Sequence, residues 1–88
     1  MTIWKYTIGT SGEFRVEMPV GAIVLSVQLQ DGRLCMWAQV EEGRSLETRY
    51  FRACETGDPI PEGEPLRFID TVQTYSGMVY HIFERLYE

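Results

Sequence analysis

The amino-acid sequence predicts a single all-β domain, a small antiparallel sandwich or partly open barrel of about seven strands. Apolar and polar residues alternate with a period of two along the whole chain, and turn signals separate these runs about every 8 to 12 residues. No stretch long enough for a helix has apolar residues at helical spacing. The chain has 88 residues, enough for one core, so we expect one domain over residues 1–88.

The first two strands are expected to form a hairpin with each other. Residues 4–8 alternate between apolar and polar, a break containing glycine follows at 9–12, and residues 14–18 alternate again. Pro19 and Gly21 end the second strand, because proline donates no ladder hydrogen bond and glycine tolerates turn dihedrals.

The next segment carries the strongest hairpin signal in the chain. Asp31 and Gly32 separate residues 23–30 from 33–41 and favour a type I′ turn, which fixes the register. The core-side pairs that this register predicts are Leu29–Leu34, Val27–Met36, Leu25–Ala38 and Ile23–Val40. The pairs on the other face are Gln30–Arg33, Gln28–Cys35, Ser26–Trp37 and Val24–Gln39.

A third strand at residues 46–54 is expected to return beside 33–41 after the loop at 42–45. A register that keeps apolar residues on the core side places Phe51 opposite Ala38. On the outer face, the same register places Arg52 opposite Trp37, Tyr50 beside Gln39 and Cys54 opposite Cys35.

Residues 55–65 hold three of the four prolines, which predicts a long, stiffened loop. Its part at 56–60 is a candidate recognition loop, because long ordered loops often carry function, although a stiff connector between sheets is favoured. A last hairpin follows, from 66–74 and 77–87, with the turn near 75–76 or, alternatively, at 76–77. With the first turn, the predicted pairs are Val72–Val79, Asp70–His81, Ile69–Ile82, Phe68–Phe83 and Arg67–Glu84.

Charge and composition exclude some functions. The chain has 13 acidic and 8 basic residues, a formal net charge of -5, and no basic run, so no direct nucleic-acid binding through phosphates is expected. Seven of the eight basic residues are arginine, and arginine suits bidentate contacts to carboxylate or phosphate. An anionic small molecule therefore stays open as a ligand.

The sequence predicts a cytoplasmic protein with no membrane contact. The first residues lack the apolar region of a signal peptide, and no apolar run approaches the length of a membrane span. Cys35 and Cys54 are too few for a disulfide scaffold and are expected to be free thiols in a reducing compartment.

Short phrases along nearly the whole chain resemble an uncharacterised family of small phage and bacterial proteins. The most specific are Met18-Pro19-Val20-Gly21-Ala22 leading into Leu25-Ser26-Val27-Gln28, and Thr56-Gly57-Asp58-Pro59-Ile60. The resemblance implies a phage or prophage setting, hence a viral protein in the host-cell cytoplasm, and no activity. The family pattern has glycine at the position of Asp70, which argues against a special role for that residue.

Catalytic and metal sites are weakly indicated. His81 and Asp70 could form a base and its orienting carboxylate, but no nucleophile is evident, because the predicted registers place Cys35 and Cys54 in a different hairpin from His81. Those two cysteines and His81 also lack zinc-site spacing. We therefore expect no catalytic residue, no metal, no cofactor and no enzymatic activity.

The best candidate binding surface is the outer face of the three central strands. Its candidate site residues are Gln28, Arg33, Trp37, Gln39, Tyr50 and Arg52. Aromatic rings beside arginine suit stacking and capture of charged groups. The same composition is also typical of a packing surface or of a self-association interface.

These observations favour a phage accessory protein that acts by binding, as a homo-oligomer, with a host protein or an anionic small molecule as further candidate partners. A competing hypothesis is a counter-defence sponge that stacks a nucleotide signal on Trp37 and holds its phosphate with Arg52 or Arg33. The sequence is also compatible with a virion or assembly component. A weaker hypothesis is an acidic protein that occupies a nucleic-acid site on a host defence complex.

Overall fold

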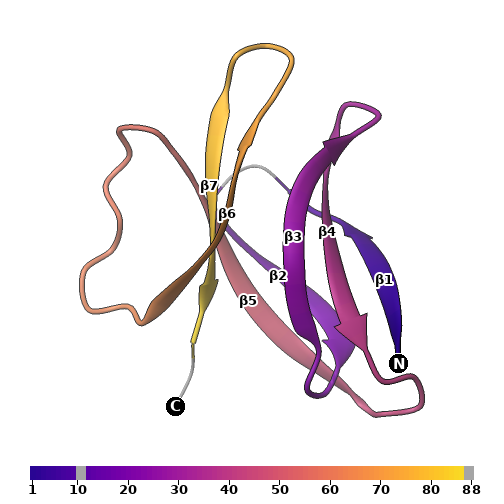
Figure 1. The fold of residues 1–88 in the computed structure, drawn as a ribbon. Helices are drawn as coiled ribbons and strands as arrows, with labels where there is room; N and C mark the ends of the chain where they lie inside the picture. The colour runs from indigo at the N-terminus through magenta and orange to yellow at the C-terminus, as the bar shows by residue number, and fades with distance from the viewer. Residues whose placement is uncertain (10–11, 87–88) are drawn as a thin grey trace.

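The structure is a computed structural model that describes residues 1–9 and 12–86. It confirms the predicted all-β fold as an open sandwich of two antiparallel sheets and rules out a closed barrel (Figure 1). The strands of the described residues are β1 (Thr2–Thr7), β2 (Gly12–Pro19), β3 (Ile23–Gln30), β4 (Arg33–Val40), β5 (Leu46–Glu55), β6 (Leu66–Gln73) and β7 (Val79–Arg85). Residues 10–11 of the predicted break and residue 87 of the predicted last strand lie outside the described residues.

The strand order is β1-β4-β3 in one sheet and β2-β5-β7-β6 in the other. The edge strands β3 and β6 lie side by side where the two sheets meet. At this junction the backbone N–H of Val27 donates to Asp70 Oδ2 at 3.1 Å, so a side chain of one sheet satisfies an edge donor of the other.

The core lies between the two sheets. Val27, Met36, Phe51 and Ile82 have no exposed surface, and Leu34 is 2% exposed. Phe51 stacks on Phe14 with ring centroids 5.5 Å apart. The predicted burial of Val27, Leu34, Met36 and Phe51 is therefore confirmed.

The central hairpin has the predicted turn but only part of the predicted register. Asp31 and Gly32 both have positive φ, 50° and 77°, as a type I′ turn requires. The pairs from Gln30–Arg33 to Ser26–Trp37 are confirmed, but a β-bulge between Val24 and Ser26 shifts the rest. Because a bulge adds one unpaired residue to one strand, Val24 lies opposite Ala38 and Ile23 opposite Gln39. The predicted pairs of Leu25, Ile23 and Val24 are wrong, and Leu25 is 47% exposed rather than buried.

The predicted first hairpin is wrong. β1 pairs with β4 and β2 pairs with β5, so the two strands belong to different sheets. The predicted pairing of β5 with β4 is wrong as well, because β5 lies between β2 and β7. Phe51 consequently faces Phe14 and Glu84 instead of Ala38. Period-two alternation identifies the apolar face of a strand but not the strand that it pairs with.

The last hairpin is also partly as predicted. Arg67–Glu84 and Phe68–Phe83 are confirmed pairs, and a bulge between Phe68 and Asp70 then shifts the register. The pairs predicted between the bulge and the turn are wrong, because the connection spans residues 74–78 and is longer than the predicted two-residue turn. The bulge then restores the predicted register at Phe68 and Arg67. The observed partners are Asp70–Ile82, Thr71–His81, Val72–Tyr80 and Gln73–Val79.

Candidate functional site

The six predicted site residues do not form one surface. Gln28, Arg33, Trp37 and Gln39 lie on β3 and β4, on the face opposite the buried Met36 and Ala38. Tyr50 and Arg52 lie on β5, on the face opposite the buried Phe51 and Ala53. Since the core fills the space between the sheets, these two outer faces point in opposite directions. The proposed joint grip of Trp37 and Arg52 on a nucleotide is therefore not formed.

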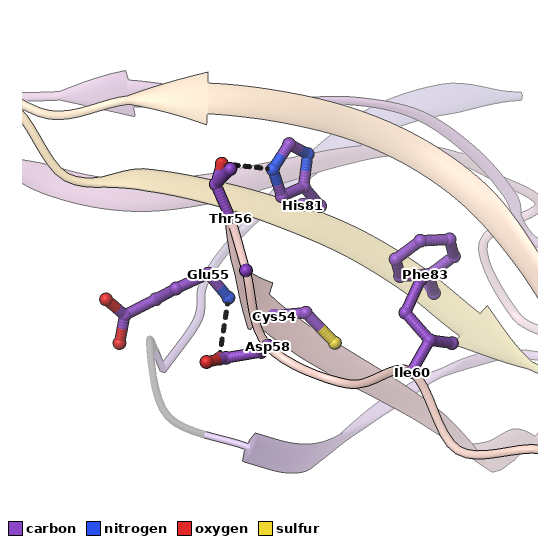
Figure 2. Close-up of a pocket in the computed structure, with 8 residues that line it drawn as sticks. Cys54, Glu55, Thr56, Asp58, Ile60, His81 and Phe83 are labelled. Atoms are coloured by element: carbon purple, nitrogen blue, oxygen red, sulfur yellow. Dashed lines mark hydrogen bonds between the residues drawn. The ribbon is translucent and has the colours of Figure 1, made fainter.

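The outer face of the four-stranded sheet has a hollow of about 270 Å³ where the loop after β5 leaves the sheet (Figure 2). We call it the loop pocket. Its lining residues are Cys54, Glu55, Thr56, Gly57, Asp58, Ile60, His81 and Phe83.

A tight turn builds one wall of the loop pocket. Asp58 N–H donates to the Glu55 carbonyl at 3.0 Å, and Glu55 N–H donates to Asp58 Oδ2 at 3.0 Å (Figure 2). Gly57 has φ of 97°, a value that favours glycine in the third position of a turn. Pro59 and Pro61 follow and stiffen the chain on both sides of Ile60.

His81 fixes the loop to the sheet. Its Nε2 lies 2.8 Å from Thr56 Oγ1 on the loop, and its Nδ1 lies 3.0 Å from Thr71 Oγ1 on β6 (Figure 2 shows the first of these contacts). The predicted partner Asp70 instead accepts hydrogen bonds from Val27 and Thr71 backbone N–H groups. The His81 ring therefore bridges two hydroxyls, and no carboxylate orients it as a base.

Cys54 lies opposite His81 on the neighbouring strand although the two residues belong to different hairpins, so the expectation that no cysteine lies near the histidine is wrong for Cys54. The Cys54 side chain is buried, and this burial raises the pKa of its thiol. A thiol that stays protonated is a poor nucleophile. Within residues 1–9 and 12–86, no group of three or more His, Cys, Asp or Glu side chains could hold a metal ion.

The far end of the loop is held by charge. Glu64 accepts hydrogen bonds from Arg52 Nη2 at 3.2 and 3.3 Å, and Arg85 Nε lies 3.7 Å from Glu64. Glu13 on β2 joins the cluster, 2.8 Å from Arg85 Nη1 and 3.8 Å from Arg52. The guanidinium of Arg52 is thus balanced by carboxylates of this chain.

Two exposed apolar side chains lie at the rim of the loop pocket, Ile60 from its lining and Phe68 against the lining residue Phe83. The acidic residues Glu55 and Asp58 lie alongside them. Ile60 is 52% exposed and Phe68 is 56% exposed. Phe68 meets Phe83 edge to face, with centroids 5.7 Å apart. An apolar hollow with exposed apolar side chains at its rim can accept an apolar side chain of another molecule. The recognition-loop candidate at 56–60 is the one sequence signal that points to this region.

A second polar cluster lies on the inner side of the same sheet. Glu84 is 4% exposed and receives hydrogen bonds from Arg49 Nε at 2.5 Å, Arg49 Nη2 at 3.1 Å and Arg67 Nη2 at 2.7 Å. The hydrogen bond to Glu84 raises the pKa of Arg49. Arg49 Nη1 also donates to the Ala22 carbonyl at 2.8 Å. This cluster joins β5, β6 and β7 to the turn before β3, so its geometry is that of a structural cross-link.

Comparison with known proteins adds a family but no activity. One family model, described as a domain of unknown function (DUF7352), matches residues 1–88. No curated protein and no solved structure matches the chain significantly. The described residues include no helix with the length and apolarity needed to cross a membrane.

Proposed function

The chain belongs to the DUF7352 family, and on that premise we propose that it is a phage or prophage accessory protein of the host-cell cytoplasm that acts by binding, as a homo-oligomer and without chemistry of its own. The phage setting comes from the sequence phrases that resemble small phage proteins. The binding role comes from the loop pocket.

The observation that carries the proposal is the contrast between the inside and the rim of the loop pocket. The two side chains inside it that could act as nucleophile or base are poorly suited to either role. Burial raises the pKa of the Cys54 thiol, and both ring nitrogens of His81 lie within hydrogen-bond distance of threonine hydroxyls. At the rim, Ile60 and Phe68 expose more than half of their surface. Exposed apolar side chains around a hollow are typical of protein interfaces.

The partner that fits this surface is a protein that inserts one of its apolar side chains into the loop pocket and carries basic residues around that side chain. The loop around the pocket carries the carboxylates of Glu55, Asp58 and Glu62, and the chain as a whole has a net charge of -5. Such charge favours approach of a basic surface.

The test is partner capture in cells with a matched pair of variants. Tagged protein is cross-linked in the bacterial host, and the captured partners are identified by mass spectrometry. Phe68→Asp places a charge at the rim of the loop pocket, whereas Ile23→Asp changes a side chain of similar exposure, 54%, on the opposite face. We expect one partner to be captured by the parent and by Ile23→Asp but lost with Phe68→Asp. Equal capture by both variants would refute this use of the loop pocket.

The nucleotide-sponge hypothesis retains one supporting observation, because Trp37 and Arg33 both lie on the outer face of β4. A panel of cyclic and linear nucleotides in a thermal-shift assay tests it. A ligand at 100 times its Kd stabilises the folded state by about 2.7 kcal/mol. A shift of that size that Trp37→Ala abolishes would favour the sponge over the protein-binding role.

A further inference from the structure

Edge strands of a sheet carry unpaired backbone groups, and three of the four edge strands of the described residues are protected from pairing with another chain. β3 has a bulge at Leu25 and an edge donor satisfied by Asp70. β6 has a bulge between Phe68 and Asp70. β2 ends at Pro19 and carries charged residues at alternate positions. Bulges, prolines and charges are the devices that prevent edge-to-edge pairing.

β1 is different. Its six residues pair with β4 in an unbroken register without a bulge, and it contains no proline. No strand of the described residues pairs with its other edge, which forms the outer boundary of the molecule (Figure 1). Apolar side chains are exposed on both of its faces, with Ile3 57% and Trp4 36% exposed.

One hydrogen bond shows which residues of β1 bond to β4 and which face the free edge. Ile8 N–H donates to the Leu34 carbonyl at 3.0 Å. In an antiparallel pair, the residues that exchange hydrogen bonds alternate with residues whose N–H and C=O point the other way. Tyr6 and Trp4 therefore bond to β4, whereas the backbone groups of Lys5 and Ile3 point to the free edge.

We propose that two copies of this chain associate through antiparallel pairing of β1 with β1, which joins the three-stranded sheets into one continuous six-stranded sheet. This inference deepens the proposed function, because it rests on the homo-oligomer part of that proposal and names the surface responsible. The partner of the free edge is a second copy of the chain, because the backbone groups and side chains of β1 are complementary to those of another β1 in antiparallel orientation.

One register satisfies that complementarity. With Trp4 opposite Trp4 of the second copy, Ile3 lies opposite Lys5 of that copy, and these two residues exchange the hydrogen bonds that point to the free edge. The indole rings then meet on the core side of the sheet, and aromatic cross-strand pairs are favourable. On the outer face, Ile3 lies opposite Lys5 of the second copy and can pack on its aliphatic stem, while the Lys5 Nζ donates to Gln30 Oε1 within its own sheet at 2.8 Å.

Two of the neighbouring registers are poorer for clear reasons, and a third, with Ile3 opposite Ile3, pairs fewer residues of the strand Thr2–Thr7. A shift of one residue would place a core-side residue opposite an outer-side residue, which the pleat does not allow. A shift by one residue in each copy toward the C-terminus would set Lys5 opposite Lys5, and like charges directly opposite are destabilising. The symmetric pairing about Trp4 therefore gives a closed dimer and no fibre.

The first test is the mass of the protein by size-exclusion chromatography with light scattering at about 100 μM. The parent and Lys5→Ala are expected at twice the mass of the 10.2-kDa chain. Lys5→Pro removes only the N–H that faces the free edge, since proline is tolerated on that side of an edge strand, and it is expected at the mass of one chain. A parent that is monomeric overturns the dimer.

The second test does not depend on how proline is tolerated. Cysteine in Trp4→Cys faces its own copy across the two-fold axis, with a Cα separation of about 4.5 Å expected for a non-hydrogen-bonded pair, which suits a disulfide. Mild oxidation with copper phenanthroline should give a covalent dimer. Tyr75→Cys, at a position 86% exposed and remote from β1, controls for random collision and should remain monomeric on a non-reducing gel.

The outcomes separate the two proposals. A dimeric Lys5→Pro variant, or a Trp4→Cys variant that cross-links no faster than Tyr75→Cys, refutes β1 pairing but leaves the homo-oligomer in place. A monomeric parent refutes both, while the loop pocket stays subject to its own capture experiment.

Discussion

At the scale of single residues, the strongest local interactions concern a buried carboxylate. Glu84 is 4% exposed and is held between Arg49 and Arg67, of which Arg49 is itself largely buried and Arg67 half exposed. Removing one partner of a buried ion pair lowers the free energy of unfolding by more than the intact pair contributes to it, because the remaining charge stays buried without a partner. The raised pKa of Arg49 makes its contribution to stability fully present at neutral pH and lost only as the pH rises through the folded-state value in strongly alkaline solution.

Glu84→Ala is therefore expected to lower the free energy of unfolding by about 3 kcal/mol, because it removes the two hydrogen bonds that Arg49 makes to a buried carboxylate. Arg49 then keeps the longer contact to Glu47 at 3.9 Å and its bond to the Ala22 carbonyl. Arg67→Ala removes a more exposed partner and should cost about 1 kcal/mol or less. Urea denaturation followed by far-UV circular dichroism measures both. Similar midpoints for the two variants would contradict the assigned burial of the Arg49–Glu84 pair.

The sequence allowed part of this cluster to be predicted. The pair Arg67–Glu84 is confirmed, but the register counted from the predicted turn is off by one residue near the turn, and the bulge between Phe68 and Asp70 brings it back to the predicted pairing. Arg49 could not be assigned, because alternation does not tell which sheet β5 joins. Of the loop pocket, the sequence indicated only the candidate recognition loop. Its residues Cys54 and His81 could not be placed together, because the predicted topology did not pair their strands.

At the scale of elements, strand positions followed from the sequence, but bulges and strand partners did not. The type I′ turn at Asp31–Gly32 fixes the register of the central hairpin only until the bulge at Leu25. In the apolar run at residues 23–25, alternation does not show where a bulge lies, because all three residues are apolar and either face could take them. The exposed Leu25 is the result.

This correction gives a quantitative prediction for the central hairpin. Met36→Ala should destabilise the protein by about 2 to 5 kcal/mol, because Met36 is fully buried and its loss leaves a cavity. Leu25→Ala removes a side chain that is 47% exposed and should cost about 1 kcal/mol or less. Denaturant midpoints show which variant loses more stability. An equal loss for both variants would support the register without a bulge, in which Leu25 is buried.

At the scale of the whole molecule, the outer face of the four-stranded sheet and the free edge of β1 are two surfaces that the described residues leave open to partners. The outer face of the four-stranded sheet carries the loop pocket with the exposed apolar side chains at its rim. In the proposed dimer, the free edge of β1 would join two copies and leave both loop pockets accessible, because the pockets lie on the other sheet. The dimer would present two identical binding surfaces, which favours avidity for a repeated partner.

Residue-resolved amide hydrogen exchange of the parent protein, followed by NMR, reports directly on whether the free edge of β1 pairs with a second copy. Trp4 and Tyr6 amides bond to β4 in one copy and should be protected at any protein concentration. Ile3 and Lys5 amides point to the free edge, so β1 pairing predicts that their protection rises with protein concentration as the dimer forms. Unprotected Ile3 and Lys5 amides at the highest concentration, beside protected Trp4 and Tyr6 amides, would show that the edge of β1 stays open and would contradict the account.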